Sequence, residues 1–326
     1  MTTFEAIRQT IAPELQQLDR RIADALASTN PLMNRVIQGY LRSKGKLIRP
    51  ILVILTARLF GSVNDKTIAS AAAVEMLHNA SLIHDDVVDE TKMRRGLPTV
   101  NALWDNHIAV LVGDFFVSNA LQQAITTSDL RVIESISLLG KTLSLGEIEQ
   151  IYNARYHTLD EKAYFEVISS KTASLFVSCV RMGAYSAGAV DDSRLEAMNR
   201  FARLLGQCFQ IRDDIFDYFD DEKSVGKPTG NDLREGKITL PLLYALTRQD
   251  LPEHGAMLSL SQKETLDDSD IHTLIGYARR AGGIDYAYAT MQRLRDEAIA
   301  ELAKVDTPDR TKVFADLIDF IIARSK

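Results

Sequence analysis

The sequence predicts an all-α protein, and three features of the chain support this fold class. No proline occurs between Pro98 and Pro228, and this stretch is rich in Ala, Leu, Ile, Ser and Glu. Apolar residues recur there at spacings of three and four, which is typical of helices that pack on one face. No stretch between turn signals alternates apolar and polar residues as a half-buried strand does. We therefore expect helix to follow helix throughout the chain.

The expected helices are separated by breaks that contain proline, glycine or polar residues. In chain order, we expect a helix over roughly residues 3–28, a break at Asn30-Pro31, a helix to about residue 43, a polar turn at 43–46, a helix from near Pro50, and long apolar helices over about 65–89 and 192–219. The polar stretch 220–237 is expected to be a mobile loop, and 249–270 an irregular surface region.

Composition narrows the class of protein. The 326 residues are 46% hydrophobic and 25% charged, so we expect one single all-helical domain over residues 1–326. The net charge of −6 disfavours nonspecific nucleic-acid binding. Cys179 and Cys208 show no metal-ligand spacing and are interpreted as small buried residues in a reducing compartment. With no secretory leader pattern and no segment of the length that crosses a bilayer, we expect a cytoplasmic enzyme.

Two acidic clusters with the same spacing are the strongest functional signal. The sequence DDVVD occurs at 85–89 and DDIFD at 213–217, each at the end of an apolar stretch. On a helix, residues four apart share a face, so two like carboxylates repel each other unless a cation neutralises them. A few hard oxygen ligands suit Mg²⁺, which substrate phosphates then complete. The first acidic cluster is Asp85, Asp86 and Asp89, and the second acidic cluster is Asp213, Asp214 and Asp217.

Basic residues near the first acidic cluster fit a phosphorylated substrate. They occur in Lys44–Pro50, before the cluster, and in Met93–Gly96, just after it. Ammonium and guanidinium groups near a glycine turn make a suitable cradle for a diphosphate. The alternative is that these segments are only solvated basic loops.

These segments resemble those of the trans-polyprenyl diphosphate synthases, the head-to-tail prenyltransferases of the all-helical isoprenoid synthase fold. The matching stretches are Gly45–Pro50, His78–Asp89, Met93–Gly96, Gly113-Asp114, Lys171-Thr172, Phe209-Gln210 leading into 213–217, Gly226-Lys227 and Asp232–Pro241. One departure is Lys44, which stands where many relatives have glycine. This difference at position 44 does not affect Lys46 and Arg49, which match the family pattern.

The resemblance implies a reaction and a metal. An allylic diphosphate ionises, the alkene of isopentenyl diphosphate attacks the cation, and loss of a proton leaves a trans double bond. About two or three Mg²⁺ ions would stabilise the departing diphosphate, held by Asp85, Asp89 and Asp213 with support from Asp86, Asp214 and Asp217. The chain offers no obvious spare general base, so we expect the released diphosphate to take the proton.

The resemblance also implies which residues hold the two substrates. For the allylic diphosphate these are Arg94, Lys171, Thr172, Gln210, Lys227 and Lys237, and for isopentenyl diphosphate they are Lys46, Arg49, His78 and Arg95. Asp85, Asp89, Asp213, Lys171 and Arg94 are the expected catalytic residues. His78 and Gln210 each have a plainer reading as a hydrogen-bonded core residue. Lys171 lies in an apolar helical run, where a lysine needs an anionic partner.

Product length depends on the residues before the first acidic cluster. Ala80 and Ser81 are small where relatives with short products carry bulky aromatic residues. A small residue leaves room for a longer prenyl chain, so we favour a long product. Resemblance to the octaprenyl diphosphate synthases implies an octaprenyl chain for the side chain of a quinone. The alternative is a farnesyl or geranylgeranyl diphosphate synthase with a stop at Met76 or Leu77.

The sequence disfavours two other functions and predicts an oligomeric state. A non-catalytic regulatory subunit of a heteromeric synthase and a terpene cyclase are disfavoured, because both acidic clusters are complete. Apolar outer stripes on long helices need covering, and members of the family pair through helices, so we expect a homodimer.

Overall fold

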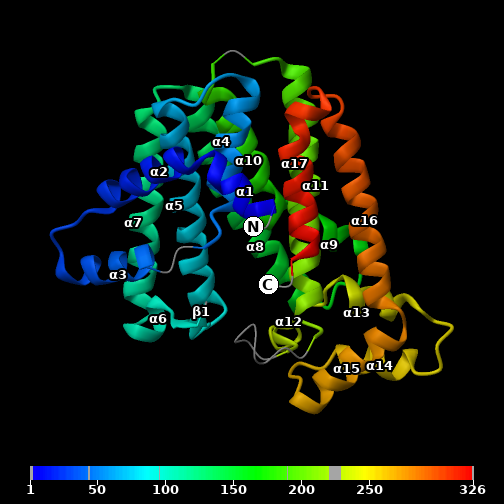
Figure 1. The fold of residues 1–326 in the computed structure, drawn as a ribbon. Helices are drawn as coiled ribbons and strands as arrows, with labels where there is room; N and C mark the ends of the chain where they lie inside the picture. Colours follow the sequence, from blue (N-terminus) through cyan, green and yellow to red (C-terminus); the bar gives the residue numbers. More distant parts are fainter. Residues whose placement is uncertain (1–2, 43–44, 95, 189, 220–228, 325–326) are drawn as a thin grey trace. The chain divides into compact units, whose positions relative to one another are not determined.

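The computed structural model describes residues 3–42, 45–94, 96–188, 190–219 and 229–324, which are mainly helical (Figure 1). The predicted all-α fold class is therefore confirmed. Two antiparallel strands of two residues each, β1 (Met93–Arg94) and β2 (Leu97–Pro98), were not predicted. Strands this short carry too few residues for an alternating pattern to be seen.

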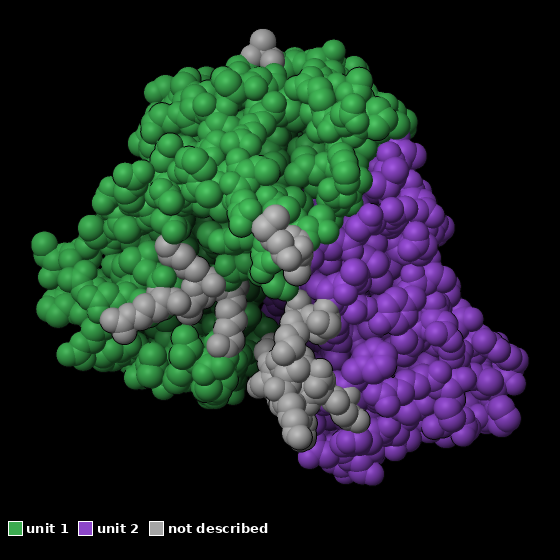
Figure 2. Space-filling view, viewed as in Figure 1, with its two compact units in different colours: residues 1–141, 175–202, 301–316 green, residues 142–174, 203–300, 317–326 purple. Residues whose placement is uncertain are grey.

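The chain divides into two compact units, each assembled from segments that are far apart in the sequence (Figure 2). Unit 1 comprises Met1–Lys141, Leu175–Ala202 and Glu301–Asp316. Unit 2 comprises Thr142–Ser174, Arg203–Ala300 and Leu317–Lys326. The expectation of one single domain over residues 1–326 stays a prediction.

The first half of the chain follows the predicted order of helices with small differences. Its elements are α1 (Thr3–Thr10), α2 (Ala12–Leu26), α3 (Pro31–Arg42), α4 (Ile48–Phe60), α5 (Asp65–Val88), α6 (Val100–Leu103), α7 (Asn106–Thr126) and α8 (Leu130–Arg155). The single helix expected over 3–28 is wrong, because α1 ends and α2 begins around Ile11. Pro13 causes the break, since it lacks an N–H and is tolerated in the first turn of a helix.

The core of unit 1 forms around α5, which contacts α2, α4 and α7. Every residue of α5 from Thr67 to Ala80 is buried, and many of them are alanines. Small side chains allow neighbouring helices to approach closely, and α5 is in extensive contact with α7. The apolar run thus ends with the first acidic cluster at the last turn of a buried helix.

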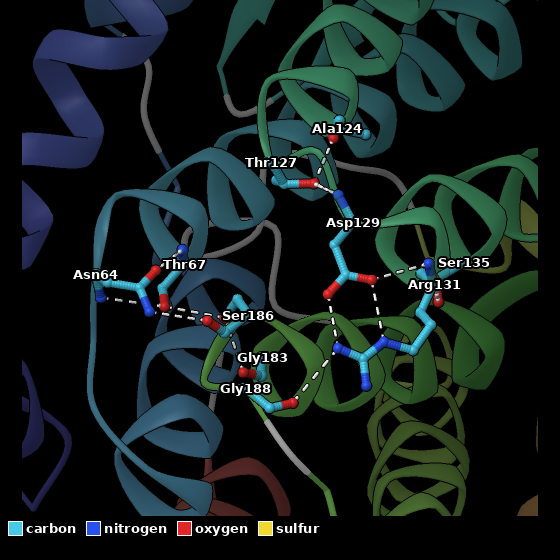
Figure 3. Close-up of polar contacts among 10 residues, drawn as sticks. All are labelled: Asn64, Thr67, Ala124, Thr127, Asp129, Arg131, Ser135, Gly183, Ser186 and Gly188. Atoms are coloured by element: carbon cyan, nitrogen blue, oxygen red, sulfur yellow. Dashed lines mark hydrogen bonds and ion pairs between the residues drawn. The ribbon is translucent and has the colours of Figure 1, made fainter.

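A polar network fixes the start of α5 to the end of α10 (Ser174–Ser186) (Figure 3). Asn64 is the N-cap of α5, and its side chain accepts a hydrogen bond from the Thr67 N–H at 3.2 Å. Its Nδ2 donates to the Ser186 carbonyl at 2.8 Å, and the hydroxyls of Thr67 and Ser186 are 2.9 Å apart. The position of the first turn of α5 is therefore set by direct bonds to a second helix.

A second polar group in the same view joins the start of α8 to the residues after α10. The Asp129 carboxylate accepts from Arg131 Nε at 3.0 Å and Nη2 at 2.7 Å, and Arg131 Nη2 also donates to the Gly188 carbonyl at 3.4 Å. The hydrogen bond from Arg131 holds the pKa of Asp129 below its usual value.

The second half of the chain is also helical. Its elements are α9 (Glu161–Ile168), a π-helical turn η1 (Ser169–Ala173), α10, α11 (Asp192–Phe216), α12 (Asn231–Arg234), α13 (Leu240–Thr247), α14 (His254–Ser261), α15 (Asp268–Arg280), α16 (Gly283–Leu302) and α17 (Pro308–Ala323). The expected mobile loop lies partly outside the described residues, at 220–228, and partly in α12. The irregular region expected at 249–270 is corrected, because α14 lies within it and packs Met257 and Leu258 on the core of unit 2.

The apolar helix α7 requires a correction to the membrane prediction. By length and composition α7 would cross a bilayer, and among the described residues it is the single helix that meets this test. The statement that no segment reaches this length is therefore wrong. In the structure α7 packs along α5 and is a partly buried core helix, with 39% of its most apolar window buried.

We predict that Asn64→Ala lowers the free energy of unfolding by about 1–2 kcal/mol, because it removes an N-cap and the bond to the Ser186 carbonyl. Urea unfolding followed by circular dichroism measures this change. Ser62→Ala, at an exposed position beside the cap, serves as the control and should change little. Equal stabilities of the Asn64→Ala and Ser62→Ala variants would contradict the anchoring role.

Candidate active site

The first acidic cluster continues the helical spacing of α5 past its last residue. Asp89 is the C-cap of α5, and its N–H bonds to the Asp85 carbonyl at 2.8 Å. Asp85 and Asp89 therefore share a face, as predicted, and both are half-buried. Asp86 points elsewhere and is buried, with 5% of its surface exposed.

Asp86 is occupied by protein donors. Arg94 Nε and Nη2 both donate to Asp86 Oδ1, at 2.9 and 2.7 Å, and Asn101 Nδ2 donates to the Asp86 carbonyl at 3.0 Å. Arg94 lies on β1, so the two-stranded turn positions the guanidinium against the helix end. Arg94 thus holds Asp86 in place, while about a third of its own side chain stays exposed.

The sequence predicted no function for His84. In the structure, this side chain packs against α7. Its Nε2 lies 3.3 Å from the Val110 carbonyl and 3.4 Å from Asp114 Oδ1, both on α7. A Cβ at Gly113 would come within 2.2 Å of that nitrogen. The Gly113-Asp114 pair therefore makes room for the imidazole and bonds it, which steadies the residue next to Asp85.

The residues expected to hold isopentenyl diphosphate lie at several places in unit 1. Lys46 is exposed just before α4, Arg49 is half-buried in the first turn of α4, and His78 is buried in α5. The Arg49 guanidinium stacks over the Phe176 ring at 5.4 Å. Arg95 lies outside the described residues.

The proposed chain-length residues differ in exposure. Ala80 is fully buried, whereas Ser81 is half-buried and donates its hydroxyl to the His78 carbonyl at 2.9 Å. Both lie on α5 within two turns of Asp85. A bulky residue at 80 would have to displace packed neighbours, while one at 81 has more space.

The second acidic cluster lies at the end of α11, where Asp214 is buried and Asp213 and Asp217 are half-buried. The Asp213 side chain is 40% exposed. Asp217 follows the helix, and its two carboxylate oxygens accept the N–H groups of Asn231 and Asp232, each at 2.9 Å. Asp217 therefore caps the start of α12, which leaves it a supporting position.

Asp214 is the buried centre of a hydrogen-bond chain. Tyr164 donates to its Oδ2 at 2.5 Å, and Gln210 Nε2 donates to its Oδ1 at 2.8 Å. Gln210 Oε1 in turn accepts from the Thr172 hydroxyl at 2.7 Å. Burial raises the pKa of Asp214 to about 7, although the hydrogen bonds from Tyr164 and Gln210 oppose this rise. Burial and the nearby Asp217 and Asp214 also raise the pKa of Asp232.

A cavity of unit 2 gathers most of the residues expected to hold the allylic diphosphate. Its lining includes Lys171, Thr172, Gln210, Asp214 and Lys237. Lys171 and Thr172 lie in the π-helical turn η1, a local distortion that is frequent at functional sites. Lys227 lies outside the described residues.

Two ammonium groups converge in this cavity, and each has an anionic partner. Lys171 pairs with Glu147, and Lys237 pairs with Glu235. With the Gln150 amide turned so that its oxygen faces the lysines, that oxygen lies 3.2 Å from Lys171 Nζ and 3.1 Å from Lys237 Nζ. The lysines are therefore close to one point, as binding of one polyanion requires.

Sequence reasoning missed Tyr164, Gln150 and Glu147. Tyr164 lies seven residues before Lys171, and Glu147 and Gln150 are three residues apart on α8, so both patterns place side chains on one helix face. These spacings are common in helices of any function. Only the interatomic distances in the structure show which side chains these three residues contact.

The carboxylates of the two clusters are of the kind that a hard divalent cation prefers. Asp86 and Asp214 are buried and accept hydrogen bonds from protein donors, whereas Asp85, Asp89, Asp213 and Asp217 are partly exposed. Oxygen ligands on one helix face suit Mg²⁺ or Ca²⁺. Within the parts of the chain that the structure describes, no three His, Cys, Asp or Glu side chains converge to hold a metal by themselves.

Comparisons with known proteins identify the family of this chain. A family model described as polyprenyl synthetase matches residues 30–278. The octaprenyl diphosphate synthase of Escherichia coli strain K12 is 34% identical over 308 residues, which cover 94% of this chain and 95% of that protein.

Solved structures extend the agreement to the whole fold. A polyprenyl synthase from Caulobacter crescentus CB15, complexed with calcium and isoprenyl diphosphate, is 31% identical with a TM-score of 0.91, covering 99% of this chain and 98% of that one. A geranylgeranyl pyrophosphate synthase from Bacteroides thetaiotaomicron is 34% identical with a TM-score of 0.84, covering 99% of each chain. The calcium of the Caulobacter complex shows that a relative binds divalent metal together with a diphosphate. The chain therefore belongs to the polyprenyl synthetase family and is a trans-prenyltransferase that makes polyprenyl diphosphate.

Proposed function

We propose that this prenyltransferase condenses isopentenyl diphosphate with an allylic diphosphate, such as farnesyl diphosphate, to a long all-trans polyprenyl diphosphate. We propose octaprenyl diphosphate as the product, for the side chain of a quinone, and the cytoplasm as the place of the reaction. The observation that carries the reaction is the unit 2 cavity, where two lysines and the Thr172–Gln210–Asp214 chain line one space.

We propose Asp85, Asp89 and Asp213 as the ligands of Mg²⁺, as the family resemblance implies, and all three side chains are partly exposed. When bound, Mg²⁺ would neutralise the charge that develops on the departing diphosphate. Asp86, Asp214 and Asp217 support the ligands by holding the helix ends in place through Arg94, Gln210 and the α12 backbone.

The lysines of the cavity would receive the allylic diphosphate. Lys171 and Lys237 pair with Glu147 and Glu235 in the structure, and a diphosphate carries more charge than a single carboxylate. The Thr172 hydroxyl and the Gln210 amide already donate to Gln210 and Asp214, so each would exchange one of these bonds for a bond to a phosphate oxygen. Lys227 and Arg94 complete the proposed set.

The second substrate would bind through Lys46, Arg49, Arg95 and His78. When the allylic C–O bond breaks, the alkene of isopentenyl diphosphate donates its electron pair to the allylic cation and forms the new C–C bond. The proton lost from the adjacent carbon goes to the released diphosphate, so no protein base is required.

The number of prenyl units in the product is a more specific proposal than the type of reaction. An octaprenyl synthase and a geranylgeranyl synthase are both 34% identical to this chain, so overall identity does not decide between them. The small residues Ala80 and Ser81 favour the longer product. A short-chain synthase remains the alternative, with the buried Met76 or Leu77 as the stop. A regulatory subunit is a remote alternative, disfavoured by two complete acidic clusters.

A homodimer is also proposed, through the outer face of α7. This face leaves large apolar side chains exposed, among them Leu111 at 64% and Ile125 at 58%. Several large apolar side chains exposed on one helix are typical of a covered interface. Its location on the partly buried α7 also explains why that helix is so apolar.

We expect Asp85→Asn and Asp213→Asn each to lower turnover by about 100-fold or more, because each removes a charge that stabilises the leaving diphosphate. Incorporation of labelled isopentenyl diphosphate into product, with farnesyl diphosphate and Mg²⁺, measures it. Asp24→Asn, on the exposed face of α2, is the control. Full turnover in either site variant would refute the metal assignment.

We expect Ser81→Phe to shorten the product while condensation continues, because the ring fills space beside α5 that a growing chain needs. Thin-layer separation of labelled products reports the length. Ser81→Ala removes the same hydroxyl without adding bulk and should leave the length unchanged. A product of unaltered length from Ser81→Phe counts against this account.

We expect Leu111→Glu to convert a dimer to a monomer, because a buried, unpaired carboxylate in an apolar interface is strongly unfavourable. Light scattering on a sizing column measures the mass in solution. Ser62→Glu, outside the α7 face, should stay dimeric. A wild-type protein that is monomeric at micromolar concentration would exclude the proposal.

A further inference from the structure

Asp213, a proposed metal ligand, already bonds a cation from its own chain. Arg324 Nη2 donates to Asp213 Oδ1 at 2.6 Å and to the Phe209 carbonyl at 3.1 Å. The Arg324 side chain is only 8% exposed, whereas that of Asp213 is 40% exposed. Arg324 directly follows Ala323, the last residue of α17, so this helix delivers the guanidinium to the end of α11.

The position of Arg324 is fixed from two sides. Its guanidinium lies 4.0 Å from the Phe209 ring centre and 5.6 Å from that of Phe216. Its carbonyl accepts hydrogen bonds from Arg212 Nε at 2.9 Å and Nη2 at 2.6 Å. The aromatic rings hold the side chain and Arg212 holds the backbone, which distinguishes this contact from a solvated surface ion pair.

Arg212 is itself anchored independently of the side chain of Arg324. It donates to the Tyr288 hydroxyl at 2.7 Å and stacks over Phe216 at 4.6 Å. A substitution of the Arg324 side chain therefore leaves the backbone contact in place. The role of the charge can be tested without detaching the end of α17.

We propose that Arg324 is a built-in counterion of Asp213 that competes with divalent metal and so sets the metal affinity of the second acidic cluster. This inference rests on the proposed assignment of Asp213 as a metal ligand. The Arg324 guanidinium occupies Asp213 Oδ1 at 2.6 Å, and its positive charge repels a metal ion that approaches the same carboxylate, so metal binding has to displace the guanidinium or overcome this repulsion.

Competition of this kind has a defined thermodynamic consequence. Metal binds more tightly to the fraction of molecules in which Arg324 has left Asp213, so the apparent affinity falls as that fraction falls. Departure is feasible because the ion pair is partly exposed on the Asp213 side. In addition, among the described residues the buried Arg324 Nε has no hydrogen-bond partner. Movement of the Arg324 side chain away from Asp213 therefore breaks no hydrogen bond at Nε. The pair also keeps the second acidic cluster partly neutralised before metal arrives.

The experiment measures Mn²⁺ binding to the metal-free full chain in the presence of inorganic pyrophosphate, with free Mn²⁺ followed by electron paramagnetic resonance. Arg324→Gln removes the charge, and we expect it to bind Mn²⁺ roughly threefold more tightly than wild type, the size expected for a partly exposed ion pair. Arg324→Lys keeps the charge and should stay close to wild type. Thermal unfolding without metal confirms that both variants are folded.

Two controls separate the possible failures. Arg200→Gln breaks an ion pair with Glu301, at 2.8 Å, elsewhere on α11 and should not change Mn²⁺ affinity. Asp213→Asn should abolish the metal site, and an unchanged affinity in this variant would overturn both the metal assignment and the inference. If Asp213→Asn weakens binding while Arg324→Gln binds as wild type or more weakly, the inference alone is overturned.

Discussion

The rest of this structure depends on one constraint, which is the repulsion between carboxylates at the helix ends. A cation has to relieve this repulsion. Each acidic cluster meets the constraint in the same way. The middle aspartate, Asp86 or Asp214, turns inward and accepts hydrogen bonds from Arg94 or from Tyr164 and Gln210. The outer carboxylates Asp85, Asp89 and Asp213 stay partly exposed. The buried middle carboxylate and its hydrogen-bond donors fix the position of the helix end. The direction in which the outer carboxylates point is fixed as a result.

Three charged side chains of unit 2 that the proposed function uses have a partner of opposite charge in the structure. Lys171 is paired with Glu147, Lys237 with Glu235, and Asp213 with Arg324. Binding of a metal–diphosphate complex is in this view an exchange of partners, in which lysines pass from carboxylate to phosphate and Asp213 passes from guanidinium to metal. Such an exchange lowers the desolvation cost that bare, unpaired charges would impose on the folded protein.

The elements with strong periodicity were predictable from sequence, and those set by single contacts were not. The apolar runs of α5 and α11 and the acidic residues at their ends follow from spacing alone, and the all-α class follows with them. Pro13 divides the first helix, although the apolar pattern continues through it. The π-helical turn at Lys171 and the bond from Tyr164 to Asp214 depend on tertiary packing, which a local pattern does not contain.

We propose that metal-dependent binding of the allylic diphosphate requires the carboxylates of both acidic clusters. Isothermal titration of the protein with an unreactive allylic thiolodiphosphate, with and without Mg²⁺, tests it most directly. The account predicts one metal-dependent binding event per chain in wild type and its loss in both Asp85→Asn and Asp213→Asn. Metal-dependent binding that persists when one cluster is neutralised, or two independent metal-dependent events per chain, would contradict it.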